Sequence, residues 1–224
     1  MSDVLIIIPA YNEAQSIERV VDELIESYPQ YDYVVVTDGP TDGTDEICRR
    51  RGYNTVFLPR NMGLTKCFKN GMSYALEKGY KYAVQFDGDG QHRPEYIEPM
   101  EKKANEGYDI VQGSRFLGDK DARMGVARAL GAMLIKRAIY KKTGVRMTDP
   151  TCGMRMYGRT MIDDFVNKED ISPEPDTIAK LIKGGARFAE VPVKVVERTT
   201  GESYLNFTNA IKYMKRILSA IRRV

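Results

Sequence analysis

The sequence predicts a single α/β domain with a mostly parallel, Rossmann-like β-sheet that helices cover on both faces. Its 224 residues, 42% of them hydrophobic and 29% charged, are enough for one sizeable core rather than two independent domains. Short β-branched runs alternate with helical patterns over the first half of the chain, and this alternation requires crossover connections between parallel strands. The second half is less regular, with no internal repeat and no low-complexity segment.

The strands of the first half are short and apolar, as expected for strands buried on both faces of a parallel sheet. They are Val4–Ile8, Tyr33–Thr37, Thr55–Leu58, Tyr82–Phe86 and Ile110–Gln112. Helices are expected between them, and these are Ala14–Ser27, Asp45–Arg51, Leu64–Lys78 and Glu95–Asn105.

Two basic helices are expected in the second half. The first runs from about Met124 to Lys142, and we expect its apolar stripe to face the core, with membrane contact as the less favoured alternative. That stripe consists of Val126, Leu130, Met133, Leu134 and Ala138. The second is the C-terminal helix, Phe207–Arg222, and no acidic residue follows Glu202, so this end of the chain can face an anionic surface. For the C-terminal helix, core packing and peripheral membrane contact are both open.

Between the two basic helices, a turn-rich loop at 148–153 leads into a short strand through Met156 and Tyr157. A helix is expected near Thr177–Lys183, followed by strand Phe188–Val196. This last strand contains Pro192, which has no backbone N–H to donate, so we expect an edge position or a bulge.

Composition excludes several protein classes. No apolar run approaches the roughly 20 residues of a membrane-spanning helix, and Val4–Ile8 lacks the basic flank and cleavage site of a signal peptide. The three cysteines are widely spaced and form no CxxC pair, which favours a reducing, cytoplasmic compartment over disulfides or structural zinc. Aromatic residues do not interleave the basic patches, so nucleic-acid binding is not expected.

Polar residues cluster where the predicted strands end. Asp87 and Asp89 follow strand 82–86, and side chains at i and i+2 of an extended segment point to the same side, so both carboxylates can bind one hard cation. Pro9-Ala10-Tyr11 and Asp38-Gly39 follow two other strands. Because ligands of parallel sheets bind beyond the carboxyl ends of the strands, we expect these strand ends to form one crevice.

The sequence lacks the glycine-rich phosphate loops of common nucleotide enzymes. A dinucleotide-binding fold needs G-x-G-x-x-G at its first strand–helix turn, but that turn reads Pro9-Ala10-Tyr11-Asn12-Glu13. No G-x-x-x-x-G-K-[ST] occurs either. A divalent cation bound by carboxylates is the obvious substitute for neutralising phosphate charge.

Four motifs stand in the order and spacing of the family 2 glycosyltransferases, and the chain resembles that family, which has the GT-A fold. The motifs are Ile8-Pro9-Ala10-Tyr11-Asn12-Glu13, Thr37-Asp38-Gly39-Pro40-Thr41-Asp42-Gly43-Thr44, Asn61-Met62-Gly63 and Asp87-Gly88-Asp89-Gly90-Gln91. The second half is similar to the dolichol-phosphate mannosyltransferase branch. The matching segments are Gly113-Ser114-Arg115, Asp149-Pro150-Thr151-Cys152-Gly153-Met154-Arg155, Glu190-Val191-Pro192-Val193 and Arg198-Thr199-Thr200-Gly201-Glu202-Ser203. The chain departs from that branch at Cys152-Gly153-Met154, where Ser-Gly-Phe is common, and at Tyr204, where a lysine is common.

The resemblance implies a single domain, 1–224, with a nucleotide-sugar-binding half at 1–115, an acceptor-side half at 116–203 and a basic amphipathic helix at 204–224. It implies a nucleotide site formed by Pro9, Tyr11, Glu13, Asp38, Asn61, Gly63, Lys66 and Asp87. In this site Asp38 accepts a hydrogen bond from the base and Lys66 reaches a phosphate. Glu13 has an alternative role at a helix amino terminus, and Asp42 is expected to be structural.

The resemblance also implies a bound Mg²⁺ or Mn²⁺. Asp89 binds the cation, Asp87 contacts the ribose, the cation or both, and Gln91 completes the coordination. The alternative for the two carboxylates is an ordinary solvated turn. The only histidine, His92, has no second histidine or cysteine at ligand spacing, so we expect it at the surface or behind the ligands rather than on the metal.

The acceptor side depends on which atom accepts the sugar. A hydroxyl acceptor requires a base, for which Glu174 and Asp176 are the candidates, although both could be first-turn helix acids. A lipid phosphate is already anionic and requires cations instead. Arg115 and Arg198 are the candidates for that contact, because a guanidinium group matches two phosphate oxygens.

The leading interpretation is an inverting, metal-dependent glycosyltransferase that moves a sugar from a nucleotide-diphosphate sugar to an envelope glycan or glycolipid. UDP and GDP donors are favoured, and dTDP is a further option. The alternative acceptor is a polyprenyl or dolichyl phosphate. A nucleotidyltransferase and a non-catalytic nucleotide-sugar-binding module are alternatives of other classes. The expected location is the cytoplasm, at the inner face of the cell membrane where the acceptor is a lipid.

Overall fold

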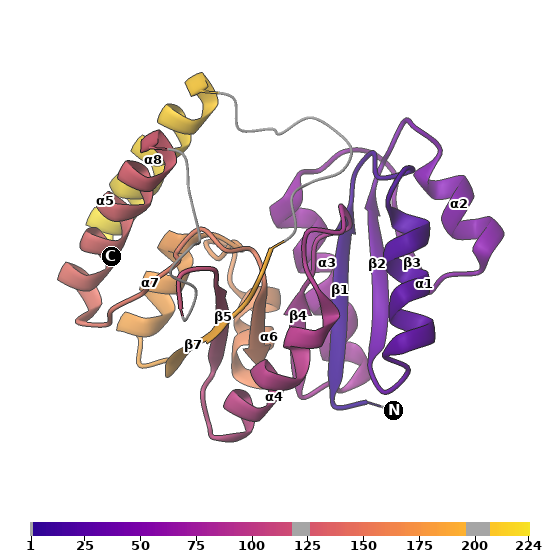
Figure 1. Cartoon of the computed structure of the whole chain (residues 1–224), viewed down its shortest axis with the longest axis horizontal. Helices are drawn as coiled ribbons and strands as arrows, with labels where there is room; N and C mark the ends of the chain where they lie inside the picture. Colours follow the sequence, from indigo (N-terminus) through magenta and orange to yellow (C-terminus); the bar gives the residue numbers. More distant parts are fainter. Residues whose placement is uncertain (1, 118–125, 196–206) are drawn as a thin grey trace.

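One β-sheet runs through the part of the chain that the computed structural model describes, residues 2–117, 126–195 and 207–224 (Figure 1). Within these ranges, seven strands follow the order β3-β2-β1-β4-β6-β5-β7. They are β1 (Val4–Ala10), β2 (Asp32–Asp38), β3 (Thr55–Leu58), β4 (Tyr82–Gln85), β5 (Ile110–Ser114), β6 (Arg155–Gly158) and β7 (Phe188–Pro192). Only β6 runs antiparallel to its neighbours, β4 and β5. The predicted α/β class with a mostly parallel sheet is therefore confirmed.

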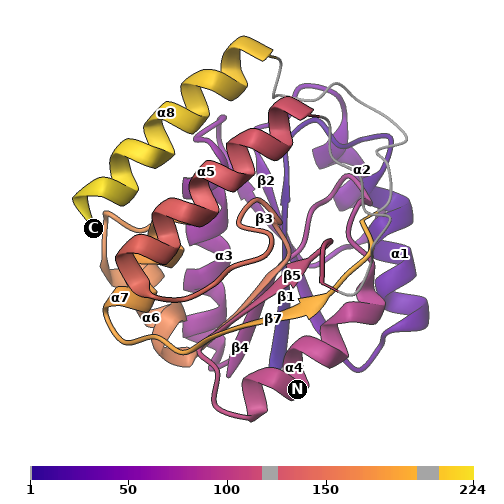
Figure 2. The ribbon, with the colours of Figure 1, turned by 60° about the vertical axis from the view of Figure 1, so that its left-hand side comes forward.

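Helices cover both faces of the sheet (Figures 1 and 2). One face is covered by α1 (Ile17–Ser27), α2 (Thr44–Arg51) and α4 (Ile97–Asn105), which follows a short 3₁₀ turn at Pro94–Tyr96. The other is covered by α3 (Leu64–Lys78), α6 (Arg159–Asn167) and α7 (Pro175–Lys183). Two further helices, α5 (Val126–Thr143) and α8 (Phe207–Arg223), lie side by side and contact α7. No helix in these described ranges has the length and hydropathy to cross a bilayer.

The central strand β1 contributes to both hydrophobic cores because successive side chains point to opposite faces. Leu5 and Ile7 pack under α3, whereas Ile6 and Ile8 pack under α1 and α4, and all four are fully buried. On the α3 face, a Cβ added to Gly71 would lie 2.3 Å from Cγ2 of Ile7. Only a glycine allows α3 to pack this closely on β1.

Most predicted elements are confirmed, with two differences. The last strand ends at Pro192, earlier than predicted, and it occupies the edge position that the proline favours. Helix α6 was not predicted. It is only nine residues long, and so short a helix is marginal in isolation. Its stability comes from packing Met161, Ile162 and Phe165 into the core beside α3.

The predicted orientation of α5 is wrong. Leu130, Met133 and Leu134 were expected to face the core but are 54%, 55% and 38% exposed, whereas Ile135 and Ile139 are 2% and 0% exposed. The helix is apolar on two sides, and hydrophobic periodicity does not say which side the neighbouring helices cover. Contacts with α7 and α8 select the side that carries Ile135 and Ile139.

Candidate nucleotide and cation site

The loops that follow β1 and β2 are joined by hydrogen bonds. Asn12 adopts a left-handed backbone conformation, with φ of 57°, and its Oδ1 accepts the N–H of Thr41 at 2.8 Å. The Asp42 carboxylate accepts the N–H of Ala14 at 2.9 Å and the hydroxyl of Thr44 at 2.6 Å. Burial acts to raise the pKa of Asp42, but these hydrogen bonds outweigh it and lower the pKa. Asp42 is structural, as predicted.

Glu13 connects this pair of loops to the loop after β4. Its backbone N–H donates to Thr44 Oγ1 at 3.0 Å, and its Oε2 accepts the hydroxyl of Ser16 at 2.9 Å. A Cβ added to Gly88 would lie 3.6 Å from Glu13 Cγ and 3.3 Å from the carbonyl oxygen of Pro9. The ends of β1 and β4 therefore meet, as expected for one crevice. The contact with Ser16, just before α1, matches the alternative role of Glu13 at a helix amino terminus.

Asp38, the last residue of β2, is 3% exposed. Its Oδ1 accepts the N–H of Met62 at 2.7 Å and its Oδ2 accepts the N–H of Gly63 at 2.8 Å. A Cβ added to Gly39 would lie 2.5 Å from the backbone of Arg60, so the two segments touch. Sequence reasoning missed this structural role. Contact between Asp38 and a base stays a prediction.

The remaining predicted nucleotide residues lie at the same end of the sheet, beyond the carboxyl ends of the parallel strands. Tyr11, directly after β1, is 45% exposed. Asn61 and Lys66 are also exposed, on the loop before α3 and in the first turn of α3. This end of the sheet therefore presents polar and aromatic side chains to solvent around the buried Asp38.

Asp87 and Asp89 have different environments. The Asp87 side chain is 37% exposed, whereas Asp89 is 4% exposed and accepts the N–H of Gln91 at 2.9 Å. His92 is 5% exposed and packs its ring against Phe86. The backbone N–H of Asp87 donates to His92 Nδ1 at 3.0 Å, and His92 Nε2 lies 3.5 Å from Asp87 Oδ2. His92 is therefore not a surface residue; it lies behind the Asp87 carboxylate.

The loop at 148–154 directly precedes β6. Because β6 runs antiparallel to β4, this loop lies at the same end of the sheet as Asp87. A Cβ added to Gly153 would lie 3.3 Å from Asp87 Oδ2, so glycine leaves space beside this carboxylate. The loop is anchored by Glu190 on β7, which accepts the backbone N–H groups of Thr148 and Asp149 at 2.8 to 3.0 Å. Burial raises the pKa of the Cys152 thiol to about 12, so this cysteine does not supply a thiolate nucleophile.

Arg115 forms a bidentate pair with Asp149. The distances are 2.6 Å from Nε to Oδ2 and 2.8 Å from Nη2 to Oδ1, and the Asp149 side chain is fully buried. Burial opposes both charges, but the mutual hydrogen bonds raise the pKa of Arg115 and lower that of Asp149. Nη2 also donates to Thr151 at 2.8 Å. Arg115 thus faces the 148–154 loop, and its predicted contact with a substrate phosphate stays a prediction.

Arg155 is a central residue that the sequence analysis did not single out. It is 2% exposed, and its Nε donates to Gln112 Oε1 at 2.8 Å. Its Nη2 donates to the carbonyl of Pro150 at 3.1 Å and its Nη1 to that of Pro173 at 2.9 Å. One guanidinium therefore connects the loop beside Asp87 to the loop that precedes α7. Burial of this arginine is visible only in the structure, and no local sequence pattern indicates it.

The two acids considered as a base lie at the start of α7. Glu174 is the N-cap residue and Asp176 is in the first turn, so the alternative role of first-turn acids fits the observed geometry. Glu174 Oε2 accepts a hydrogen bond from Nη2 of Arg216, on α8, at 2.6 Å. Asp176 Oδ1 is buried without a hydrogen-bond partner in the described part of the chain. Arg198, the second predicted phosphate ligand, lies outside the described residues.

The residues around Asp87 and Asp89 fit Mg²⁺ or Mn²⁺. The described ranges contain no cluster of three or more His, Cys, Asp or Glu side chains that could form a complete metal site. Magnesium-type ions, however, bind through one or two carboxylates when substrate phosphates supply other ligands. The space that Gly153 leaves beside Asp87 is consistent with such a shared site.

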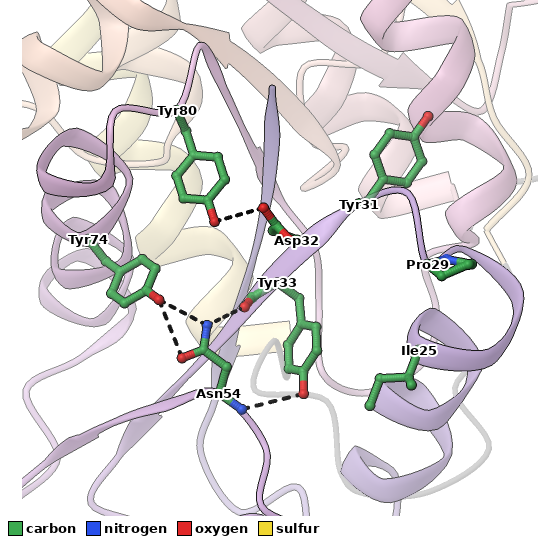
Figure 3. Close-up of a pocket in the computed structure, with 8 residues that line it drawn as sticks. All are labelled: Ile25, Pro29, Tyr31, Asp32, Tyr33, Asn54, Tyr74 and Tyr80. Atoms are coloured by element: carbon green, nitrogen blue, oxygen red, sulfur yellow. Dashed lines mark hydrogen bonds between the residues drawn. The ribbon is translucent and has the colours of Figure 1, made fainter. Parts of the chain in front are cut away.

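A tyrosine-lined pocket of about 420 Å³ lies at the opposite end of the sheet, where the parallel strands begin. Figure 3 shows the residues that line it. It is lined by Ile25, Pro29, Tyr31, Asp32, Tyr33, Asn54, Tyr74 and Tyr80. Asp32 begins β2 and accepts the hydroxyl of Tyr80 at 3.0 Å, and Asn54 donates to the carbonyl of Tyr33 at 2.7 Å. The pocket is thus at the amino-terminal ends of the strands, away from Asp87 and Asp89.

Solved structures share this fold. Glucosyl-3-phosphoglycerate synthase from Mycobacterium tuberculosis in complex with phosphoglyceric acid superposes with a TM-score of 0.67 at 18% identity, covering 97% of this chain and 78% of that one. Its complex with Mn²⁺, UDP and phosphoglyceric acid gives the same TM-score at 17% identity and the same coverage. The predicted GT-A fold is confirmed.

Sequence relatives cover nearly the whole chain. Polyprenol monophosphomannose synthase from Mycolicibacterium smegmatis is 29% identical to this chain. The match covers 95% of this chain and 84% of the synthase. Undecaprenyl-phosphate mannosyltransferase from Micrococcus luteus is 31% identical to this chain. That match covers 91% of this chain and 87% of the transferase. The model named "Glycosyl transferase family 2" matches residues 5–166. The chain therefore belongs to glycosyl transferase family 2.

Proposed function

We propose that this enzyme transfers a sugar from a nucleotide-diphosphate sugar to the phosphate of a polyprenyl lipid, with inversion and with Mg²⁺ or Mn²⁺ at Asp87 and Asp89. The observation that carries the proposal is the similarity over nearly the full chain to two transferases whose names specify polyprenol and undecaprenyl phosphate. A polyprenyl phosphate therefore replaces the glycan or glycolipid as the leading acceptor.

The donor half of the proposal depends on the strand-end loops. The Asp38 carboxylate fixes the loop of Met62 and Gly63, so the wall beside the predicted base site is preformed. Asn61, Lys66 and Tyr11 are exposed at this edge and available to the nucleotide. Complexes of a synthase with the same fold contain UDP-glucose and Mn²⁺, which supports UDP as one candidate, and GDP stays the other.

The chemistry on the acceptor side is simple. A phosphate oxygen of the lipid attacks the anomeric carbon of the sugar, and the bond from that carbon to the diphosphate breaks on the opposite face. The nucleoside diphosphate leaves with the bonding electron pair. When bound, the cation neutralises charge on that leaving group. Because the attacking oxygen is already anionic, no base is required, which agrees with the pairing of Glu174 to Arg216.

The residues of this chain position the reactants. Asp87 and Asp89 would hold the cation, which would supply positive charge near the diphosphate, and His92 orients Asp87. Glu190 and Arg155 fix the loop that approaches Asp87 through Gly153. Pre-positioned groups of this kind lower the barrier because little reorganisation is needed in the transition state.

The test is a transfer assay with undecaprenyl phosphate in detergent and Mn²⁺, using GDP-mannose, UDP-glucose and a dTDP-sugar in parallel. A lipid-linked sugar in the mass spectrum, together with release of nucleoside diphosphate, is expected for one donor. Transfer to a hydroxyl acceptor but to no prenyl phosphate would overturn the acceptor assignment. Release of pyrophosphate would indicate a nucleotidyltransferase, and donor binding without turnover would indicate a binding module.

A further inference from the structure

Arg19, in the first turn of α1, packs on the segment that contains Asp87 and Asp89. A Cβ added to Gly90 would lie 2.2 Å from Nη2 of Arg19, 3.0 Å from its Cζ and 3.2 Å from its Nη1. The guanidinium therefore occupies the space in which any other residue at position 90 would place its side chain. Arg19 is not among the residues that the sequence analysis assigned to the nucleotide or the cation.

Gly90 is required by the turn as well as by this contact. Its φ is 78°, a left-handed backbone conformation that favours glycine. The turn allows the N–H of Gln91 to point back and donate to Asp89 Oδ1 at 2.9 Å. Gly90 lies between these two residues in the chain, so a group that fixes Gly90 also fixes the direction of the Asp89 carboxylate.

A second contact from α1 lies one helical turn further along. Glu23 follows Arg19 by four residues, which places both on one face of the helix, and its Oε1 lies 3.7 Å from Arg93 Nη1. The side chains of Glu23 and Arg93 are 30% and 38% exposed, so this pair contributes little by itself. Together with Arg19 it connects both ends of segment 90–93 to α1. The helix is a firm support because its core residues are buried, and these are Ile17, Val20, Val21 and Leu24.

The contact of Arg19 with Gly90 is a packing contact. Arg19 forms no hydrogen bond or ion pair with any residue that the structure describes. A positive charge one residue away from Asp89 would by itself repel a divalent cation. Packing and charge therefore act in opposite directions on cation binding, and substitutions of Arg19 can separate them.

We propose that Arg19 is a positioning residue of the cation site: it packs in the space that Gly90 leaves open and thereby holds Asp89 in the direction required to bind Mg²⁺ or Mn²⁺. The inference rests on the proposed function, because it gives Arg19 a role toward that cation. A ligand that is already oriented binds more tightly, since less conformational freedom is lost on binding. Residues that orient metal ligands typically contribute roughly 10- to 100-fold to metal affinity.

The experiment compares R19A with R19M, which keeps a long, adaptable side chain against Gly90 but has no charge. Mn²⁺ binding to the full chain is measured from the electron paramagnetic resonance signal of free Mn²⁺, with UDP and separately with GDP, relative to the same mixture without protein. R19A is expected to weaken Mn²⁺ binding by roughly tenfold. R19M should bind Mn²⁺ nearly as tightly as wild type. R50A, which removes an exposed arginine of α2 that pairs with Glu18 of α1, is the matched control and should bind like wild type.

Gly90→Ala provides an independent test. The added methyl group displaces Arg19 and strains the left-handed turn. G90A should therefore weaken Mn²⁺ binding at least as much as R19A does. The double variant R19A/G90A should bind no more weakly than G90A, because the arginine is already displaced in G90A.

Hydrogen exchange of the proteins without ligand measures the contact separately from the function. The amides of residues 87–93 should exchange faster in R19A than in R50A, with the rest of the chain unchanged. Equal exchange in the two variants, or Mn²⁺ binding by R19A at the wild-type level, overturns the proposal. Binding by R19M as weak as that by R19A would assign the effect to charge and also overturns it, as do additive losses in R19A/G90A. Absence of Mn²⁺ binding by wild type with either nucleotide would instead overturn the cation assignment of the proposed function, and with it the role of Arg19 toward the cation.

Discussion

Asp87 and His92 contact each other twice. The backbone N–H of Asp87 donates to His92 Nδ1 at 3.0 Å, which requires an unprotonated Nδ1 and leaves the proton of the neutral ring on Nε2. That second nitrogen lies 3.5 Å from Asp87 Oδ2. The buried imidazole thus connects the backbone and the side chain of a carboxylate proposed to bind the cation, an arrangement that fixes ligand orientation in many metal sites.

Replacing His92 should therefore weaken use of the cation more than it weakens the fold. H92A removes both contacts with Asp87, and we expect the Mn²⁺ concentration for half-maximal transfer to rise by roughly 10- to 100-fold. H92N, whose amide oxygen can accept the same N–H, should recover part of this loss. Initial rates across a Mn²⁺ titration measure both effects. A parallel fall in melting temperature and rate, with an unchanged Mn²⁺ midpoint, would mean that His92 only supports the fold.

Asp89→Asn tests the cation site itself. The variant keeps the shape of the side chain and an oxygen that can accept from Gln91, but it removes the negative charge. We expect transfer to fall by about a thousandfold or more, because charge stabilisation at a leaving group contributes several kcal/mol. The melting temperature without Mn²⁺ should stay near that of wild type. Transfer at the wild-type rate would contradict the assignment of Asp89 to the cation.

The strands and helices of the first half were predictable because their sequences satisfy local rules. Thr55–Leu58 and Leu64–Lys78 match the structure to the residue. The convergence of Pro9, Asp38 and Asp87 followed from the rule that parallel strands end at one edge.

Other features depend on packing between distant segments. The buried face of α5 is chosen by α7 and α8, and the antiparallel position of β6 by the pairing of Gln85 with Arg155. From the sequence alone, Arg155 would be expected to lie at the surface like most arginines. Its role arises because Pro150 and Pro173, which are 23 residues apart in the chain, present their carbonyls to one buried guanidinium. No local pattern contains that information.

Arg155→Met is expected to destabilise the protein strongly. The substitution leaves Gln112 Oε1 and two proline carbonyls without their donor in a buried position, and each such loss costs about 1 to 3 kcal/mol. We expect the free energy of unfolding in urea to fall by about 3 kcal/mol or more. For comparison, R159M affects an exposed arginine that also donates to two carbonyls, and it should cost less. Equal losses would mean that burial adds nothing to the role of Arg155.

The pair of Arg115 and Asp149 should make stability depend on pH in the acidic range. The pKa of Asp149 lies below the ordinary 3.8 in the folded protein, so its contribution is complete well above that value and is lost as pH falls through the folded pKa. Asp149→Asn should therefore destabilise the protein by about 3 kcal/mol at neutral pH. The gap between variant and wild type should narrow below about pH 4. Urea unfolding at several pH values measures it, and a gap independent of pH would show that the pair contributes no net charge interaction.

Glu174→Gln and Asp176→Asn distinguish the two acceptor chemistries. An anionic phosphate acceptor needs no proton removed, so both variants should keep the rate of transfer within a few-fold of wild type. A hydroxyl acceptor would instead lose about 100- to 10,000-fold with whichever acid is the base. Because Glu174 accepts from Arg216, R216Q serves as a control for the loss of that ion pair alone. Single-turnover rates with saturating donor separate chemistry from binding. If one acid variant is inactive in transfer to a prenyl phosphate while R216Q is not, that carboxylate acts in the reaction and a base-free mechanism is wrong.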